Sequence, residues 1–135
     1  MKFLAYLLFY AYVITLILAG VWGVFFARID HRLLFHLDIH TLAPVTAASL
    51  VSQYRFLRAV EFGFGMFSIV YRREIFTLRA FNRLFLATMS FGIVARIVSL
   101  ILDGQPFWIF YLFLATEFVG VILIYLYSRR TLEKV

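Results

Sequence analysis

Five charged side chains lie inside stretches that are otherwise apolar enough to be buried in a membrane: Arg55, Arg58, Glu61, Arg96 and Glu117. A charge at the centre of a bilayer costs about 2.5–3.5 kcal/mol on insertion scales, so such residues are kept where they are paired, hydrated or functional. Arginine offers a rigid fork of donors to an anion or a carbonyl oxygen. A carboxylate in the same setting can carry a proton. These residues are therefore the first candidates for binding or chemistry.

Helical spacing places the first three of these charges together. Successive residues of an α-helix are about 100° apart, so Arg58 and Glu61 share one stripe and Arg55 lies on its flank. The same geometry puts Ser99 on the face of Arg96 in a later helix. Asp103 extends that second stripe to the end of the helix.

A four-residue turn, 103–106, joins the helices that carry Arg96 and Glu117. Arg96 lies seven residues before Asp103, and Glu117 lies eleven residues after Pro106. The offset of four residues corresponds to about 6 Å along the helix axis, which an arginine side chain can span. We therefore predict that Arg96 contacts Glu117, and that both lie near Arg58 and Glu61 in the outer half of a bundle.

Three interpretations of this charged cluster remain open at the level of sequence. The first is a structural network of ion pairs that fixes helix register. The second is a polar cavity in which arginine receives the anionic or carbonyl group of a ligand. The third is proton transfer or acid–base chemistry that uses Glu61 or Glu117.

Composition indicates that the solvent of this chain is lipid. Of its 135 residues, 64% are hydrophobic and 15% are charged, whereas soluble domains have about 45–50% apolar and about 25% charged residues. The net charge of +6 comes from basic residues clustered at the ends of apolar spans, a distribution typical of membrane topology and not of nucleic-acid binding. The absence of cysteine excludes disulfides and thiolate metal sites, and no cofactor motif is present.

The hydropathy pattern predicts an all-α membrane protein, a single domain of residues 1–135 built as a bundle of four transmembrane helices. The expected spans are about 3–27, 44–71, 84–102 and 107–128. Pro44 suits the first turn of a helix, where a missing N–H is tolerated. Ala19 and Gly23 form a small-xxx-small pair, which favours close contact with a neighbouring helix.

Residues 28–43 are expected to form a strap at the outer membrane interface. Within it, Phe35 to His40 alternates apolar and polar residues, which predicts an extended segment with His36, Asp38 and His40 on one side. Imidazole and carboxylate ligands at this spacing suit a divalent metal. We favour histidines at the headgroup level over a metal site.

Three sequence features resemble a bacterial family of four-span proteins known as domain of unknown function 4345, grouped with the DoxX-like membrane proteins. One is an arginine followed by spaced glycines, here Arg55 or Arg58 before Gly63 and Gly65. The second is an Arg-x-x-Ser-x-x-x-Asp-Gly-x-Pro run that begins at Arg96. The third is the glutamate Glu117 in the last helix. The resemblance implies the four-helix bundle but no activity.

The resemblance also bears on location and ligand. It implies a multi-pass protein of the bacterial inner membrane, and quinone-linked relatives suggest a lipid or quinone as ligand. We expect a non-enzymatic binding or accessory protein surrounded by membrane lipids, with a partner subunit or a second copy as a further contact. A purely structural subunit, an enzyme and a proton-coupled transporter remain the alternatives.

The distribution of basic residues predicts that both termini are cytoplasmic, because positive residues are retained on that side. The stretch from Arg72 to Arg83 carries four arginines, and the stretch from Arg129 to Lys134 carries three basic residues. A reporter enzyme that is active only in the periplasm should therefore be inactive when fused after Val135 and active when fused after Gly104. Activity of the C-terminal fusion would contradict the four-span topology.

Overall fold

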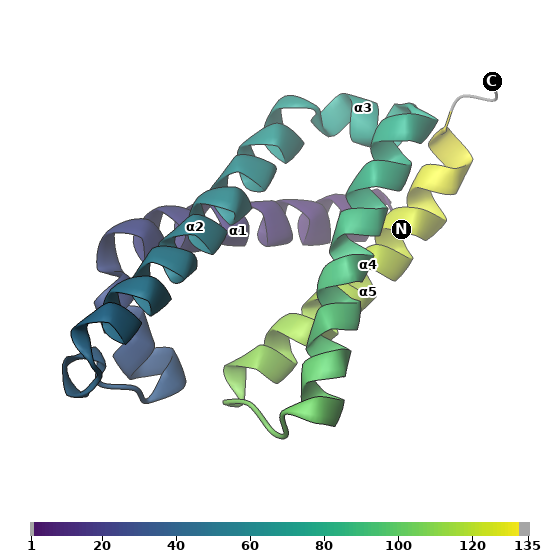
Figure 1. Cartoon of the computed structure of the whole chain (residues 1–135). Helices are drawn as coiled ribbons and strands as arrows, with labels where there is room; N and C mark the ends of the chain where they lie inside the picture. The colour runs from purple at the N-terminus through teal and green to yellow at the C-terminus, as the bar shows by residue number, and fades with distance from the viewer. Residues whose placement is uncertain (1, 133–135) are drawn as a thin grey trace. The chain divides into compact units, whose positions relative to one another are not determined.

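The computed structural model describes residues 2–132, and these form helices joined by short connections (Figure 1). The elements are α1 (Lys2–Phe35), the 3₁₀ helix η1 (Ile39–Thr41), α2 (Pro44–Val70), α3 (Arg72–Thr77), α4 (Arg79–Leu102) and α5 (Ile109–Thr131). No strand occurs among the described residues. The predicted all-α class is confirmed.

The chain divides into two compact units. One comprises Met1–Val13 together with Ser68–Val135, and the other comprises Ile14–Phe67. The prediction of a single domain stays a prediction.

Three helices of the described chain are long and apolar enough to cross a membrane: α1, α4 and α5. Helix α2 has 27 residues, but it does not meet the same criterion of apolar content. Its charges Arg55, Arg58 and Glu61 lie in the middle of the helix, where an apolar stretch of spanning length would have to include all three. Residues 2–132 thus contain three candidate spans.

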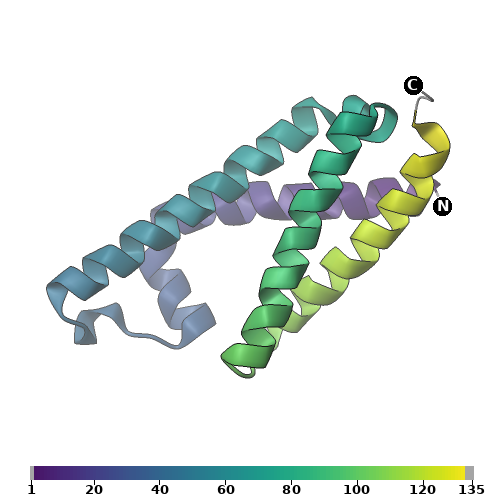
Figure 2. The same ribbon diagram turned by 45° about the vertical axis from the view of Figure 1, so that its right-hand side comes forward.

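The predicted strap is partly wrong, because α1 continues through its first half. Helix α1 runs on to Phe35 after a bend at Phe26, whose φ of −111° and ψ of 26° are not helical. The bend is visible in Figure 2, where the helix changes direction before it ends. A turn through His36, with φ of 52°, leads to η1 and then to α2, which begins at Pro44 as predicted. The extended segment expected at 35–40 is therefore a helix end, a turn and a 3₁₀ helix.

A small apolar core holds the connection against the two helices of the second unit. Ile39 of η1 is buried in one cluster with Ala27 of α1 and Val51 of α2, and Ala47 and Tyr54 pack against it. Burial of Ile39 explains why the connection turns toward the helices.

Two glycines allow α1 and α2 to approach closely in this unit. A Cβ atom placed on Gly20 would lie 2.7 Å from the Cβ of Phe62 and 2.8 Å from the carbonyl oxygen of Arg58. A Cβ on Gly23 would lie 2.6 Å from the Cδ of Arg58. The predicted close contact at Gly23 is present, and Gly20 supplies a second small residue beside it.

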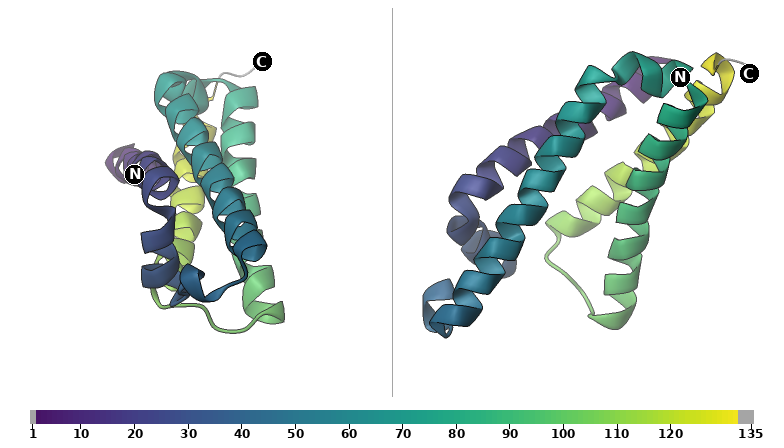
Figure 3. Two further views of the ribbon diagram at one scale, coloured as in Figure 1. Left: turned by 60° about the vertical axis from the view of Figure 1, so that its left-hand side comes forward. Right: turned by 45° about the horizontal axis from the view of Figure 1, so that its top comes forward.

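Aromatic packing organises the first unit, in which α3, α4 and α5 contact one another. The fully buried ring of Phe76 in α3 stacks on Tyr6 at 4.4 Å between centroids and lies 5.2 Å from Phe9. The hydroxyl of Thr131 donates to the carbonyl oxygen of Phe76 at 2.8 Å. These contacts fix α3 to the end of α5. Figure 3 shows α4 and α5 meeting near α3 and separating toward the loop that joins them.

Gly20→Ala should destabilise the protein by about 1–3 kcal/mol, because the new methyl group meets backbone atoms that cannot rotate away. Gly63→Ala is the matched control, since a Cβ at Gly63 has no atom within 4 Å and alanine favours a helix by about 0.5–1 kcal/mol. Thermal unfolding in detergent measures both. Equal stability of the two variants would show that α1 and α2 do not pack as described.

Candidate functional site

A buried carboxylate connects α1 and α2 in the second unit. Asp30 is only 6% exposed. Its Oδ1 accepts a hydrogen bond from Trp22 Nε1 at 2.9 Å, and its Oδ2 accepts one from the hydroxyl of Tyr54 at 2.7 Å. The bond from Trp22 bridges the bend at Phe26, because Trp22 and Asp30 lie on opposite sides of it in sequence. Asp30 therefore ties both halves of the bent α1 to α2.

Arg58 continues this network through two of its three guanidinium nitrogens. Its Nη2 donates to the Tyr54 hydroxyl at 2.6 Å, and its Nη1 donates to Glu61 Oε2 at 2.7 Å. The guanidinium also lies over the Tyr54 ring, 4.8 Å from its centroid. Its Nε is buried without a hydrogen-bond partner where the side chain crosses Gly23, which leaves no room for a ligand there. The hydrogen bonds and the ring contact described for Arg58 are thus with α2 residues of the protein itself.

His31 supports the same arrangement from α1. It is 3% exposed, and its Nδ1 lies 2.7 Å from the carbonyl oxygen of Ala27. A carbonyl oxygen only accepts, so Nδ1 carries the hydrogen of this bond. The imidazole packs edge-on against the Tyr54 ring at 4.8 Å, which fixes the position of the tyrosine that links Asp30 to Arg58.

Arg55 differs from Arg58 because it borders an open groove. Its Nε donates to the carbonyl oxygen of Val24 at 3.0 Å, close to the bend of α1. The groove has a volume of about 550 Å³. Its lining combines basic residues with small and apolar ones: Arg28, Ile39, His40, Leu42, Pro44, Ala47, Ala48, Val51, Ser52 and Arg55.

The metal candidates of the connecting segment do not converge on a common point. Asp38 Oδ1 accepts a hydrogen bond from the backbone N–H of His40 at 3.0 Å and so caps η1. Among residues 2–132 no group of three or more His, Cys, Asp or Glu side chains is placed to hold a metal ion. His40 instead lines the groove, and His36 adopts the left-handed turn before η1.

In the first unit, Arg96 and Glu117 form a two-pronged ion pair between α4 and α5. Arg96 Nε donates to Glu117 Oε2 at 2.9 Å, and Arg96 Nη2 donates to Oε1 at 3.1 Å. The Arg96 guanidinium also lies over the rings of Phe110 and Phe113, at 5.9 and 5.6 Å. The Glu117 side chain is 12% exposed and that of Arg96 32%. This geometry is strong and directional, and it satisfies the carboxylate on both oxygens.

Ser99 and Asp103 form a separate contact at the end of α4. The Ser99 hydroxyl donates to Asp103 Oδ2 at 2.7 Å, and the Asp103 N–H donates to the Ser99 carbonyl oxygen at 2.8 Å. Gly104 follows with φ of +95°, a conformation that favours glycine. These residues therefore end the helix and shape the loop.

The family described as domain of unknown function 4345, DUF4345, matches residues 4–128 of the chain. The chain belongs to this family. No curated protein and no solved structure matches it. In this DUF4345 protein the run from Arg96 to Pro106 supplies three things: one half of an ion pair, the helix-terminal bond of Ser99 and the positive φ of Gly104.

The contacts expected within each candidate group of the DUF4345 protein are present. Arg58 pairs with Glu61, and Arg96 with Glu117. The meeting of these two pairs concerns residues of different units and stays a prediction.

Sequence reasoning missed Asp30, Tyr54 and Trp22 as parts of the network. A signal for Asp30 existed, because it is the first acidic residue of the chain and follows a long apolar run. Nothing comparable distinguished Tyr54 or Trp22 from the other aromatic residues.

Glu117→Gln should destabilise the DUF4345 protein because it leaves the Arg96 guanidinium without its counter-charge. Adding Arg96→Gln should restore part of the loss, with a coupling of about 0.5–3 kcal/mol between the two sites. Thermal unfolding of both single variants and the double variant, at fixed lipid content, measures this coupling. Purely additive losses would show that Arg96 and Glu117 are not coupled.

Proposed function

We propose that this DUF4345 protein is a non-enzymatic binding or accessory protein of the bacterial inner membrane that holds a small amphipathic molecule in the groove beside Arg28 and Arg55. The groove carries the proposal. It combines a volume in the range of small-molecule sites, which is about 300–1,000 Å³, with apolar walls and basic residues at its border. Lipid, quinone or another amphipathic molecule is the class of ligand.

The contacts of α2 support a fourth membrane span. Its 27 residues correspond to about 40 Å of helix, longer than the hydrocarbon core of about 30 Å. Arg58 and Glu61 neutralise each other, and Arg55 donates to a backbone carbonyl. Paired charges cost less in a membrane than isolated ones, so the polar content of α2 is compatible with spanning.

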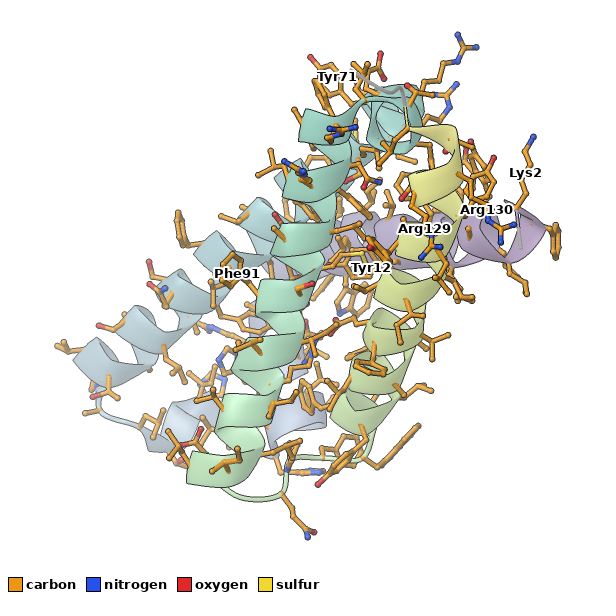
Figure 4. The ribbon with its side chains drawn as sticks, turned by 90° about the vertical axis from the view of Figure 1, so that its right-hand side faces the viewer. Lys2, Tyr12, Tyr71, Phe91, Arg129 and Arg130 are labelled. Carbon is orange, nitrogen blue, oxygen red and sulfur yellow. The ribbon has the colours of Figure 1, made fainter. Side chains whose placement is uncertain are left out.

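The distribution of basic residues supports cytoplasmic termini. Figure 4 shows Lys2, Arg129 and Arg130 at the same end of the first unit, and all three are exposed. Exposed Arg72 and Arg73 begin α3 in that unit. Basic residues at the end of a span favour the cytoplasmic side.

Among the predicted cluster residues, Arg55 is the one suited to bind. Arg58 is engaged by Tyr54 and Glu61, and Arg96 is engaged on two prongs by Glu117. Both pairs therefore act as structural elements within a binding protein. This agrees with the interpretation of the ion pairs as a structural network. The proposed ligand therefore binds in the groove and not at the ion pairs.

The enzyme and transporter alternatives receive less support. Each requires a carboxylate that is available for proton exchange, and Glu61 and Glu117 are both paired with arginine.

Outside the groove, the large exposed apolar side chains of α4 and α5, such as Phe91 and Phe118, suit contact with lipid, a partner subunit or a second copy.

Ala48→Trp should remove the co-purifying ligand, because the indole would occupy the groove that Ala48 lines. Ser49→Trp is the matched control, since Ser49 is the next residue of the same helix, is exposed and does not line the groove. Native mass spectrometry with lipid analysis of both proteins is the measurement. Retention of the same molecule by both variants would place the ligand elsewhere and contradict the proposal.

A further inference from the structure

The groove is basic without a compensating acid. None of the residues that line it is acidic, whereas Arg28, Arg55 and His40 are basic. The two acids nearest in sequence to its lining are already engaged: Asp30 by Trp22 and Tyr54, and Asp38 by the N–H of His40. The lining of the groove is therefore basic, and neither of these acids forms an ion pair with Arg28 or Arg55 among the described residues.

The two arginines retain donors for a ligand. Arg55 uses its Nε on Val24, and the described chain gives its two Nη atoms no hydrogen bond. Arg28 is exposed and forms no ion pair within residues 2–132. The bond to Val24 anchors the planar guanidinium at the bend of α1, so its remaining fork is oriented before a ligand arrives. A fixed fork is the geometry that recognises the paired oxygens of phosphate and carboxylate.

The remaining walls suit the apolar part of the same ligand. Ile39, Leu42 and Val51 contribute aliphatic surface, and Ala47 and Ala48 keep the groove wide. A free oxyanion would use only the arginines, whereas an acidic amphiphile would use both kinds of wall. An uncharged head would leave the two guanidinium groups without an anion.

We infer that the groove recognises an oxyanion, a phosphate or carboxylate group held between Arg28 and Arg55, and that its natural occupant is an acidic amphiphile. This inference rests on the proposed binding function and names the ligand class of that site. The inference favours an acidic lipid over an uncharged quinone as the ligand. The volume of the groove alone does not distinguish between these two.

The test compares binding of three probes to the full chain in detergent by native mass spectrometry: phosphatidylglycerol, phosphatidylcholine and ubiquinone. Phosphatidylglycerol should bind at least about tenfold more tightly than the other two, because hydrogen bonds to charged groups are the stronger ones. Arg28→Gln and Arg55→Lys should each reduce that preference by about tenfold. Arg55→Lys keeps the charge and removes the fork, so it tests geometry.

Arg32→Gln is the matched control, because Arg32 is exposed near the end of α1 and does not line the groove. It should bind phosphatidylglycerol as the unaltered protein does. Circular dichroism confirms that each variant is folded. Arg28→Gln, which breaks no ion pair of the described chain, keeps the test decisive if Arg55→Lys fails to fold.

A second arm distinguishes a lipid headgroup from a free anion. Inorganic phosphate is compared with chloride at equal ionic strength by thermal unfolding. One outcome is that phosphate stabilises the protein and Arg28→Gln abolishes this effect, while phosphatidylglycerol binds no more tightly than the other lipids. That result would support an oxyanion site and exclude the lipid as its occupant.

Two results would overturn the inference in distinguishable ways. Equal binding of the three lipids, unaffected by Arg28→Gln but lost in Ala48→Trp, would refute the oxyanion while leaving the proposed function intact. No binding of any probe, with no effect of Ala48→Trp on co-purifying lipid, would refute both.

Discussion

The guanidinium of Arg58 crosses Gly23 and connects, through Tyr54, to the buried carboxylate of Asp30. An arginine inside an apolar unit requires an anion nearby, since an uncompensated buried charge is costly. Here the anion Glu61 comes from the same helix, whereas Asp30 comes from α1. The contacts that compensate the charge of Arg58 therefore depend on how α1 packs against α2. Helix α1 must present a residue without a side chain, Gly23, where Arg58 passes.

The two units satisfy their charges in different ways. In the second unit Arg58 and Glu61 lie three residues apart in α2 and form a local ion pair. Helix α1 contributes Asp30, whose carboxylate accepts a hydrogen bond from Tyr54. In the first unit the pair joins two helices, and both oxygens of Glu117 are used by one arginine. Residues 14–67 contain four arginines and three acids. Among the described residues only Arg58 forms an ion pair in this unit, and of the other three arginines Arg28 and Arg55 line the groove.

Sequence periodicity predicted the helices and the two Arg–Glu contacts because both follow from fixed helix geometry. The stripe of Arg58 and Glu61 needs only the helical repeat, and the contact of Arg96 with Glu117 needs only a short turn between antiparallel helices. The bend at Phe26 could not be predicted, because no proline or glycine occupies it. The residues that stabilise the bend are brought together by tertiary contacts.

The groove could not be predicted either, and for a related reason. It is formed by residues that come together only when η1 folds back on the two helices, with Ile39 buried against Ala27 and Val51. The alternation of residues 35–40 favoured an extended segment, and burial of Ile39 outweighed it. Only Arg55 of the predicted charged cluster lines the groove.

The ion pair of the α4–α5 hairpin has a consequence for the order of events during synthesis. Arg96 and Glu117 are separated by 21 residues, so the ribosome must reach α5 before Arg96 acquires its counter-ion. A translocating chain that released α4 alone into lipid would expose an unpaired guanidinium, whereas release of both helices together would not. Helices α4 and α5 therefore suit joint entry as a hairpin. Helix α2, in contrast, carries Glu61 within one turn of Arg58, so this arginine has its counter-ion as soon as its own helix is made.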